Sequence, residues 1–307
     1  MREAMFDPNK IALIGVPSSA GARQRGQEQA PRALRRAGLP ERLRAAGRDV
    51  LDLGDLPSVA FHPDARNPKR QNLALVVGVA EQVAGAVDAA LTARAWPLVV
   101  GGDCTLSIGI LATLARRLPS LGLLYLDGDV DLNTPETTAS GIFDGMVIAH
   151  ILGKGAQELS RLGPRHPLLE EQNVTLFGYS ARAGGLDPVE IELLRDSRMA
   201  RYPLEEIEGD PRAFAARALS ELEGRVEHIL VHFDVDVIDV ADFAAVDVPH
   251  DPGLSLTGTK EALQVFLASP RVVGLAVTEF NPAGDADDQL AHRLVDTLAD
   301  AIGGERG

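Results

Sequence analysis

Short apolar runs that alternate with longer helical patterns limit this chain to few folds. The runs end in Gly- or Asp-rich segments, as strands commonly do. They cover residues 10–16, 50–53, 97–100, 121–126, 174–177, 226–233 and 272–278. Strands that are covered on both faces read as unbroken apolar runs. We therefore predict an α/β fold, a three-layer α-β-α sandwich with a mostly parallel central sheet.

The helical patterns lie between these runs. They cover residues 30–46 (with a Gly/Pro interruption near 38–40), 71–95, 106–118, 188–195 and 211–223. Residues 66–69 and 153–167 are predicted surface loops. The long segment 239–255 has no regular pattern, which is typical of loops that line sites. No shift in composition marks a linker, so we expect a single domain over residues 1–307.

The charge of the chain argues against two classes of partner. A formal net charge of −14 predicts a surface that repels nucleic acid and anionic membranes. Residues 1–9 lack the apolar core of a signal peptide, and charged or polar residues interrupt the stretch 73–95, which therefore reads as a packed helix rather than a membrane span. Because Cys104 is the one cysteine, no internal disulfide can form. We expect a cytoplasmic protein.

Acidic residues follow two of the apolar runs. Asp127, Asp129 and Asp131 alternate after residues 121–126, so an extended backbone would place them on one face. Asp234 and Asp236 follow residues 226–233. Ligands bind at the carboxyl ends of strands in such sheets, and clustered carboxylates repel unless a cation neutralises them. The five residues therefore predict a divalent-metal site, and the alternative is that they cap turns and helices.

Four ordered segments resemble the signature blocks of arginases and related ureohydrolases. They are Gly-Gly-Asp-Cys-Thr at 101–105, Asp-Gly-Asp-Val-Asp-Leu-Asn at 127–133, His-Phe-Asp-Val-Asp at 232–236 and Glu-Phe-Asn-Pro at 279–282. The N-terminal segments at 14–17, 25–26 and 54–57 look more like arginase than agmatinase. The resemblance covers nearly the whole chain. It implies an arginase-like fold with about eight strands and a dinuclear manganese site that activates water to attack a guanidinium carbon.

The resemblance also implies a set of metal ligands. The two histidine ligands of the family fall on Cys104 and Asp129, and both residues can still ligate a metal. A third family histidine, thought to shuttle protons, falls on Asp144. The expected ligands are Cys104, Asp127, Asp129, Asp131, Asp234 and Asp236.

Other matched positions imply contacts with a substrate. Glu279 matches the acid that pairs with the guanidinium, and Asp144 becomes the candidate acid or base. The candidates that would hold the amino-acid end of the substrate are Asn133, Thr138, Ser140 and Asp187. Ile142 replaces a polar family position, which favours a modified guanidine or a different amino-acid end over arginine itself.

The substitutions leave more than one function open. In one interpretation the chain is a metal-dependent hydrolase of a C–N bond in a small guanidino or amidino compound, arginine or an arginine-like substrate, and releases urea or an analogue. Manganese is then the expected metal, or zinc or iron if Cys104 ligates it. In another, the chain is a degenerate, non-catalytic homologue, metal-free or singly metallated, with a binding or regulatory role. A third keeps metal only for structure or assembly. The resemblance further implies a homo-oligomer, a trimer or a hexamer.

Single residues have alternatives as well. Cys104 is either a metal ligand or a small buried hydrophobe. Asp144 is either an acid–base group or the cap of a helix that begins near Gly145. His232, two residues before Asp234, and His250, in the long loop, are further candidates for the site.

Overall fold

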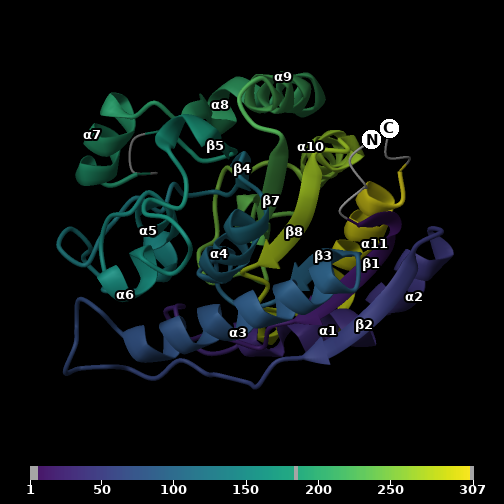
Figure 1. The fold of residues 1–307 in the computed structure, drawn as a ribbon, viewed down its shortest axis with the longest axis horizontal. Helices are drawn as coiled ribbons and strands as arrows, with labels where there is room; N and C mark the ends of the chain where they lie inside the picture. The colour runs from purple at the N-terminus through teal and green to yellow at the C-terminus, as the bar shows by residue number, and fades with distance from the viewer. Residues whose placement is uncertain (1–5, 183–185, 305–307) are drawn as a thin grey trace.

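Eight parallel strands form one sheet, in the order β2-β1-β3-β8-β7-β4-β5-β6 (Figure 1). The structure, a computed structural model, describes residues 6–182 and 186–304. The strands are β1 (Asp7–Gly15), β2 (Asp49–Asp55), β3 (Ala95–Val100), β4 (Leu121–Leu126), β5 (Val174–Phe177), β6 (Ala200–Tyr202), β7 (His228–Asp234) and β8 (Val272–Thr278). The predicted α/β sandwich is confirmed, and every strand pair in the sheet is parallel.

Helices alternate with the strands along the chain, as crossovers between parallel strands require. The α-helices are α1 (Ala30–Arg36), α2 (Leu39–Ala45), α3 (Leu73–Thr92), α4 (Leu106–Arg117), α5 (Val147–Ile151), α6 (Gln157–Ser160), α7 (Pro188–Asp196), α8 (Leu204–Ile207), α9 (Pro211–Glu223), α10 (Leu256–Ala268) and α11 (Gln289–Ile302). Short 3₁₀ helices are η1 (Gln27–Gln29), η2 (Asp144–Met146), η3 (Glu171–Asn173), η4 (Val235–Val237) and η5 (Pro282–Gly284).

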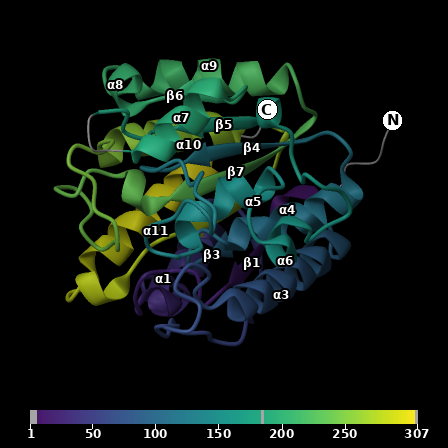
Figure 2. The same ribbon diagram turned by 90° about the vertical axis from the view of Figure 1, so that its left-hand side faces the viewer.

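Two hydrophobic cores lie on opposite faces of the sheet. In β1, Ile11 and Leu13 join the core that contains α1, α2 and α8–α11, whereas Ala12 and Ile14 join the core that contains α3–α7. Figures 1 and 2 show the two helix layers from different sides. Strands β3 and β4 are buried at every position. Coverage on both faces therefore explains why these strands read as unbroken apolar runs.

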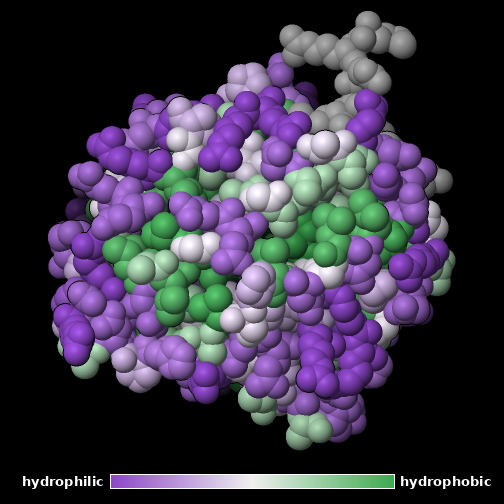
Figure 3. Space-filling model, turned by 60° about the horizontal axis from the view of Figure 1, so that its bottom comes forward, coloured by the Kyte–Doolittle hydropathy of each residue, from purple (hydrophilic) through white to green (hydrophobic). Residues whose placement is uncertain are grey.

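Helix α3 has the length and apolar composition to cross a membrane, and no other helix of residues 6–182 and 186–304 does. One side of it packs into the second core through residues at helical spacing, among them Val76, Ala80, Val83 and Val87. A helix in the core of a globular protein can be equally long and apolar, so the length and composition of α3 are weak evidence for a membrane span. Its other side is partly exposed. Figure 3 shows apolar residues in a band across this side of the molecule.

Most predicted elements are confirmed to within a few residues. The predicted bounds of β4, β5, β8 and α9 are those observed. The predicted interruption in residues 30–46 separates α1 from α2 at Gly38, whose φ of 87° only glycine adopts readily. The prediction of a loop over 153–167 is wrong in part, because α6 lies within it. Strand β6 and helix α8 were not predicted.

The middle of the sheet positions the site. Strands β3, β8, β7 and β4 are neighbours and parallel, so their carboxyl ends lie at one edge. The four segments that the sequence singled out directly follow these ends: 101–104 after β3, 279 after β8, 234–236 at the end of β7 and 127–131 after β4. The topology therefore brings all of them together.

Candidate metal centre and active site

A small cavity lies at this edge of the sheet. Its volume is about 100 Å³. The lining residues are Arg23, Cys104, Asp127, Asp129, Asp131, Ser140, Ile142, Asp144, Gly145, Asp234, Asp236 and Val248. All six predicted metal ligands are among them, so the structure brings the ligand candidates to one cavity.

Two glycines turn the chain from β3 into the site. Gly101 and Gly102 have φ values of 90° and 86°, which residues with a Cβ rarely adopt. A Cβ on Gly102 would also lie 3.0 Å from the carbonyl oxygen of Val16. This tight turn directs Cys104 towards the ends of β7 and β8 instead of continuing the strand.

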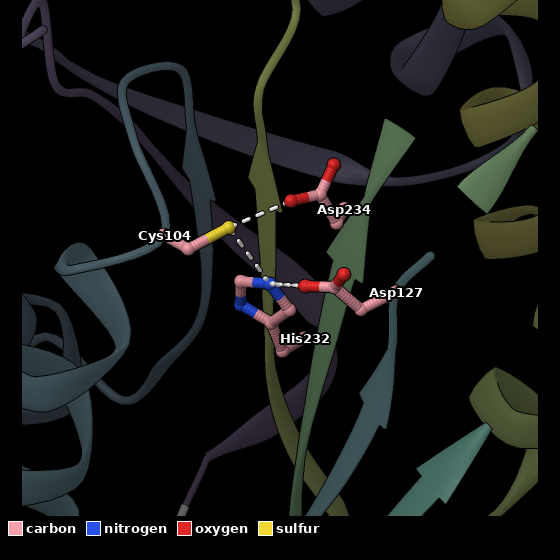
Figure 4. Close-up of side chains that lie close together, drawn as sticks. All are labelled: Cys104, Asp127, His232 and Asp234. Atoms are coloured by element: carbon pink, nitrogen blue, oxygen red, sulfur yellow. Dashed lines mark hydrogen bonds and ion pairs between the residues drawn. The ribbon is translucent and has the colours of Figure 1, made fainter. Parts of the chain in front are cut away.

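Cys104 is the centre of a buried polar group (Figure 4). Its Sγ donates to Asp234 Oδ2 at 2.7 Å and lies 3.3 Å from His232 Nε2. Asp127 Oδ2 lies 3.8 Å from the same His232 nitrogen, and this buried oxygen has no hydrogen-bond partner among the described residues. The ligand atoms of the four residues all lie within 4.8 Å of one another. The group therefore offers a thiol, an imidazole and two carboxylates around one point.

His232 is fixed in a form that can bind a metal. It is fully buried, its ring stacks on Tyr125 with centroids 4.1 Å apart, and its Nδ1 lies 2.7 Å from Ser107 Oγ. Burial lowers the pKa of His232 to about 3, so the imidazole is neutral. A neutral imidazole whose other nitrogen is held by a neighbour is a common metal ligand. The structure thus places this further candidate in the site.

A second group of possible metal ligands lies at the same cavity. Asp129, Asp236 and His250 offer ligand atoms within 4.8 Å of one another. His250 Nε2 lies 3.6 Å from Asp129 Oδ2 and 3.9 Å from Asp236 Oδ1. His250 comes from the long loop that the sequence predicted to line a site.

Asp131 lines the cavity but belongs to neither group. Its Oδ2 accepts a hydrogen bond from the hydroxyl of Tyr125, and its backbone has a φ of 48°. The structure therefore gives this predicted ligand a hydroxyl partner in the described chain.

Asp144 and Glu279 lie next to Cys104. Asp144 Oδ1 accepts the backbone N–H of Cys104 at 2.8 Å, and no side chain caps the short helix that Asp144 begins. The alternative that Asp144 caps this helix is therefore wrong. Glu279 is 1% exposed and is not among the residues that line the cavity, and its carboxyl group lies within 4.8 Å of ligand atoms of Cys104 and Asp144. Its Oε2 accepts from the amide of Gln27, and its Oε1 has no partner among the described residues.

The four residues expected to hold the amino-acid end have separate local roles. Thr138 is buried, and its Oγ1 accepts the N–H groups of Ser140 and Gly141 at 3.1 Å. Ser140 lines the cavity. Asp187 caps α7, and its Oδ2 accepts from Asn133 Nδ2 at 2.8 Å. Ser140 is thus at the cavity, whereas Thr138, Asn133 and Asp187 lie outside its lining.

Sequence reasoning missed three residues of the site. Arg23 supplies the one cationic side chain that lines the cavity within the described chain, and Val248 lines it from the long loop. Gln27 is fully buried against Glu279. Its neighbours at 25–26 form one of the matched segments, which is the one sequence signal that pointed to it.

Burial gives the acids of this site unusual pKa values. Burial and the charge of Asp129 raise the pKa of Asp127 to about 7. Burial and the charge of Asp234 raise the pKa of the Cys104 thiol. Burial also raises the pKa values of Asp131, Asp144, Asp234, Asp236 and Glu279. Such acids must hold protons or a cation. Together with the unpartnered Asp127 oxygen, they fit divalent cations.

Comparison with known proteins finds relatives over nearly the whole chain. The model of the arginase family matches residues 9–303. Arginases of Bacillus caldovelox and Brevibacillus brevis are each 30% identical to the chain, over 95% of it and 98% or 97% of their own length. The solved arginase of B. caldovelox superposes with a TM-score of 0.90 over 97% of this chain and 99% of that one. The Bacillus cereus arginase structure gives 0.87 at 30% identity, covering 96% of this chain and 98% of that one. The chain therefore belongs to the arginase family.

Proposed function

We propose that this protein is a cation-dependent hydrolase of a C–N bond in a small guanidino or amidino compound. One observation carries the proposal: a cavity edge where buried Asp127, Asp234 and Cys104 converge with an oxygen left unpartnered. Buried acids without counter-charge are costly, and divalent cations supply that charge. Family membership supports hydrolysis. Manganese follows from the resemblance, whereas the thiol of Cys104 favours zinc or iron.

Two groups of donors would hold the cations. Cys104, Asp127, His232 and Asp234 form one, and Asp129 and Asp236 belong to the other. Asp131 joins them if it exchanges its Tyr125 partner for a metal. When bound, the cations supply Lewis acidity, which makes water a better nucleophile near neutral pH.

The remaining acids would bind the substrate and move the proton. Water releases a proton as its oxygen bonds to the guanidinium carbon, the C–N bond to the rest of the substrate breaks, and the leaving amine takes a proton from the site. Asp144 would donate the proton that the amine takes, because burial raises its pKa and it lines the cavity, and the proton that water releases would restore it. Glu279, whose carboxyl group lies within 4.8 Å of that of Asp144, would pair as a carboxylate with the guanidinium group, because the positive charge of the substrate opposes the effect of burial on its pKa. Ser140, with Asn133 and Asp187 further out, would contact the other end of the substrate.

Elemental analysis followed by turnover assays tests the proposal. Protein purified without chelator is analysed for metals before and after incubation with Mn²⁺. It is then assayed for release of urea or ammonia from arginine, other guanidino compounds and formimino compounds. We expect about two cations per chain and turnover of at least one compound, both lost in Asp127→Asn and Asp234→Asn. Absence of bound metal under both conditions would support the non-catalytic alternative instead. Bound metal without turnover would support a structural metal.

Homo-oligomerisation as a trimer or hexamer stays a prediction from the resemblance. The apolar band on the α3 side of the molecule is compatible with a subunit contact (Figure 3). In α3, Leu75 is an exposed large hydrophobic residue. Light scattering coupled to size exclusion measures the mass in solution. A mass near 32.6 kDa, that of one chain, would contradict the prediction.

A further inference from the structure

The loop between η4 and α10 holds His250 by its backbone. The loop closes at its base through isolated bridges that pair Ile238 with Leu254 and Asp239 with His250. The N–H of Val240 donates to the carbonyl of His250 at 3.0 Å, and the N–H of Asp239 donates to Leu254 at 2.9 Å. His250 is therefore anchored beside Asp129 and Asp236, which line the cavity, even though the loop has no helix or strand of its own.

The His250 ring is directed at two carboxylates without bonding to either. Its Nε2 is buried and has no hydrogen-bond partner in the described chain, at 3.6 Å from Asp129 Oδ2 and 3.9 Å from Asp236 Oδ1. These separations are too long for hydrogen bonds. A cation about 2.1 Å from each of two ligands separates those ligands by roughly 3–4 Å. The spacing therefore suits ligands around an ion.

Gly128 makes room for the ring. A Cβ added to Gly128 would overlap His250 at Cδ2 and Nε2. Gly128 is not among the residues with a positive φ, so its backbone does not itself require glycine. The His250 ring therefore occupies the space that a side chain at position 128 would need. This contact places His250 directly against the segment that carries Asp127 and Asp129.

We propose that His250 is a ligand of a divalent cation held with Asp129 and Asp236. The inference rests on the cation site of the proposed function and adds a ligand to it from the loop. A set of two carboxylates and one imidazole differs from the group of Cys104, Asp127, His232 and Asp234, which includes a thiol. The two cation positions therefore differ in chemistry: the His250 position takes cations that prefer oxygen and nitrogen, and the Cys104 position takes softer ones.

The competing explanation is that His250 is protonated and replaces a cation with its own charge. It forms an ion pair with Asp129 in that case. The two explanations predict opposite effects of removing the ring. Loss of a ligand weakens cation binding, whereas loss of a positive charge strengthens it.

Titration calorimetry with Mn²⁺ on chelator-stripped protein separates them. Wild-type protein is compared with His250→Ala and with Gly128→Ala, which displaces the ring but changes no ligand. Controls are exposed His292→Ala and Gly85→Ala, where an added Cβ meets nothing within 4 Å. We expect Mn²⁺ at one of the two positions to bind at least 10-fold more weakly, or not at all, in both test variants, with unchanged circular dichroism.

Other outcomes would overturn the inference. Equal or tighter Mn²⁺ binding in His250→Ala sinks it, even if the wild type binds two cations and the proposed function stands. The inference also fails if the wild type binds one Mn²⁺ and neither variant changes the affinity for it. No Mn²⁺ binding in the wild type overturns the proposed function together with this inference.

Discussion

At the scale of single residues, Gln27 supplies a hydrogen-bond donor to the buried carboxyl group of Glu279. The Gln27 amide donates to Glu279 and, at 3.2 Å, to Asp247. Gln27→Ala leaves two carboxyl groups without this donor, so we expect the free energy of unfolding to fall by about 1–3 kcal/mol. In a Glu279→Met background the same change should cost less, because residue 279 then has no acceptor for the Gln27 amide. Urea unfolding of the four proteins measures the coupling.

Exposed Gln82→Ala is the control for this cycle, and its effect should stay within about 0.5 kcal/mol. An equal cost of Gln27→Ala in both backgrounds would show that the amide does not act on Glu279.

The state of Cys104 shows whether the group of Cys104, Asp127, His232 and Asp234 binds a metal. If the thiolate is a ligand, Co²⁺-loaded protein should show a sulfur-to-cobalt charge-transfer absorption band. Cys104→Ser should abolish the band and weaken Co²⁺ binding. A spectrum without that band in the wild type, at full Co²⁺ occupancy, would leave Cys104 as a buried hydrophobe.

The sequence predicted the acids of the site better than its imidazoles. Asp127, Asp234 and Asp236 follow strand ends directly, and strand order and direction alone bring them together. His232 depends on the stacking of its ring on Tyr125, and His250 depends on the path of a loop and on space over Gly128. Neither is encoded in a local pattern, so the sequence could only offer them as candidates.

At the scale of elements, helices α3 and α4 are closely packed at Gly109. A Cβ on Gly109 of α4 would overlap the backbone carbonyl of Ala80 in α3. Gly109→Ala should therefore lower the free energy of unfolding by about 1–3 kcal/mol through overpacking. Gly85→Ala, on the exposed side of α3, is its matched control and should raise it by about 0.5–1 kcal/mol.

The unfolding midpoint in urea measures both variants. Shifts of the same sign would contradict the close approach of the two helices.

Helices and strands were predictable where the apolar pattern extended over many residues and where turn or capping residues stood at its ends. Strand β4 and helix α9 have the predicted bounds, the latter because Asp210 and Pro211 mark its beginning. Strand β6 has three residues and α6 four, too few to show a period. Strand β6 is positioned by pairing at the edge of the sheet, and α6 by packing against α5. Such contacts cannot be deduced from a short stretch of sequence.

At the scale of the whole molecule, an acidic chain places several of its carboxyl groups in a buried site. The net charge is −14, and six carboxyl groups there have raised pKa values. An acid whose pKa is higher in the folded than in the unfolded state binds more protons when folded. Its stabilising effect is complete below the unfolded pKa and is lost as pH rises through the folded one.

For Asp127 this window runs from its ordinary value of 3.8 to about 7. Chelator-treated protein should therefore unfold at a lower temperature at pH 8 than at pH 6. Saturating Mn²⁺ should remove or reverse this difference, because ligation requires the deprotonated carboxylates and strengthens as pH rises. Thermal unfolding at the two pH values, with chelator and with Mn²⁺, measures both effects.

Asp127→Asn should flatten the pH dependence of the chelated protein, since it removes one of these titrating groups, whereas exposed Glu41→Gln should leave it unchanged. A chelated wild type that is more stable at pH 8 than at pH 6 would mean that the acids are ionised and tolerated without a cation. The negative charge of the cavity would then be balanced by the protein itself, and the case for bound cations would lose its electrostatic basis.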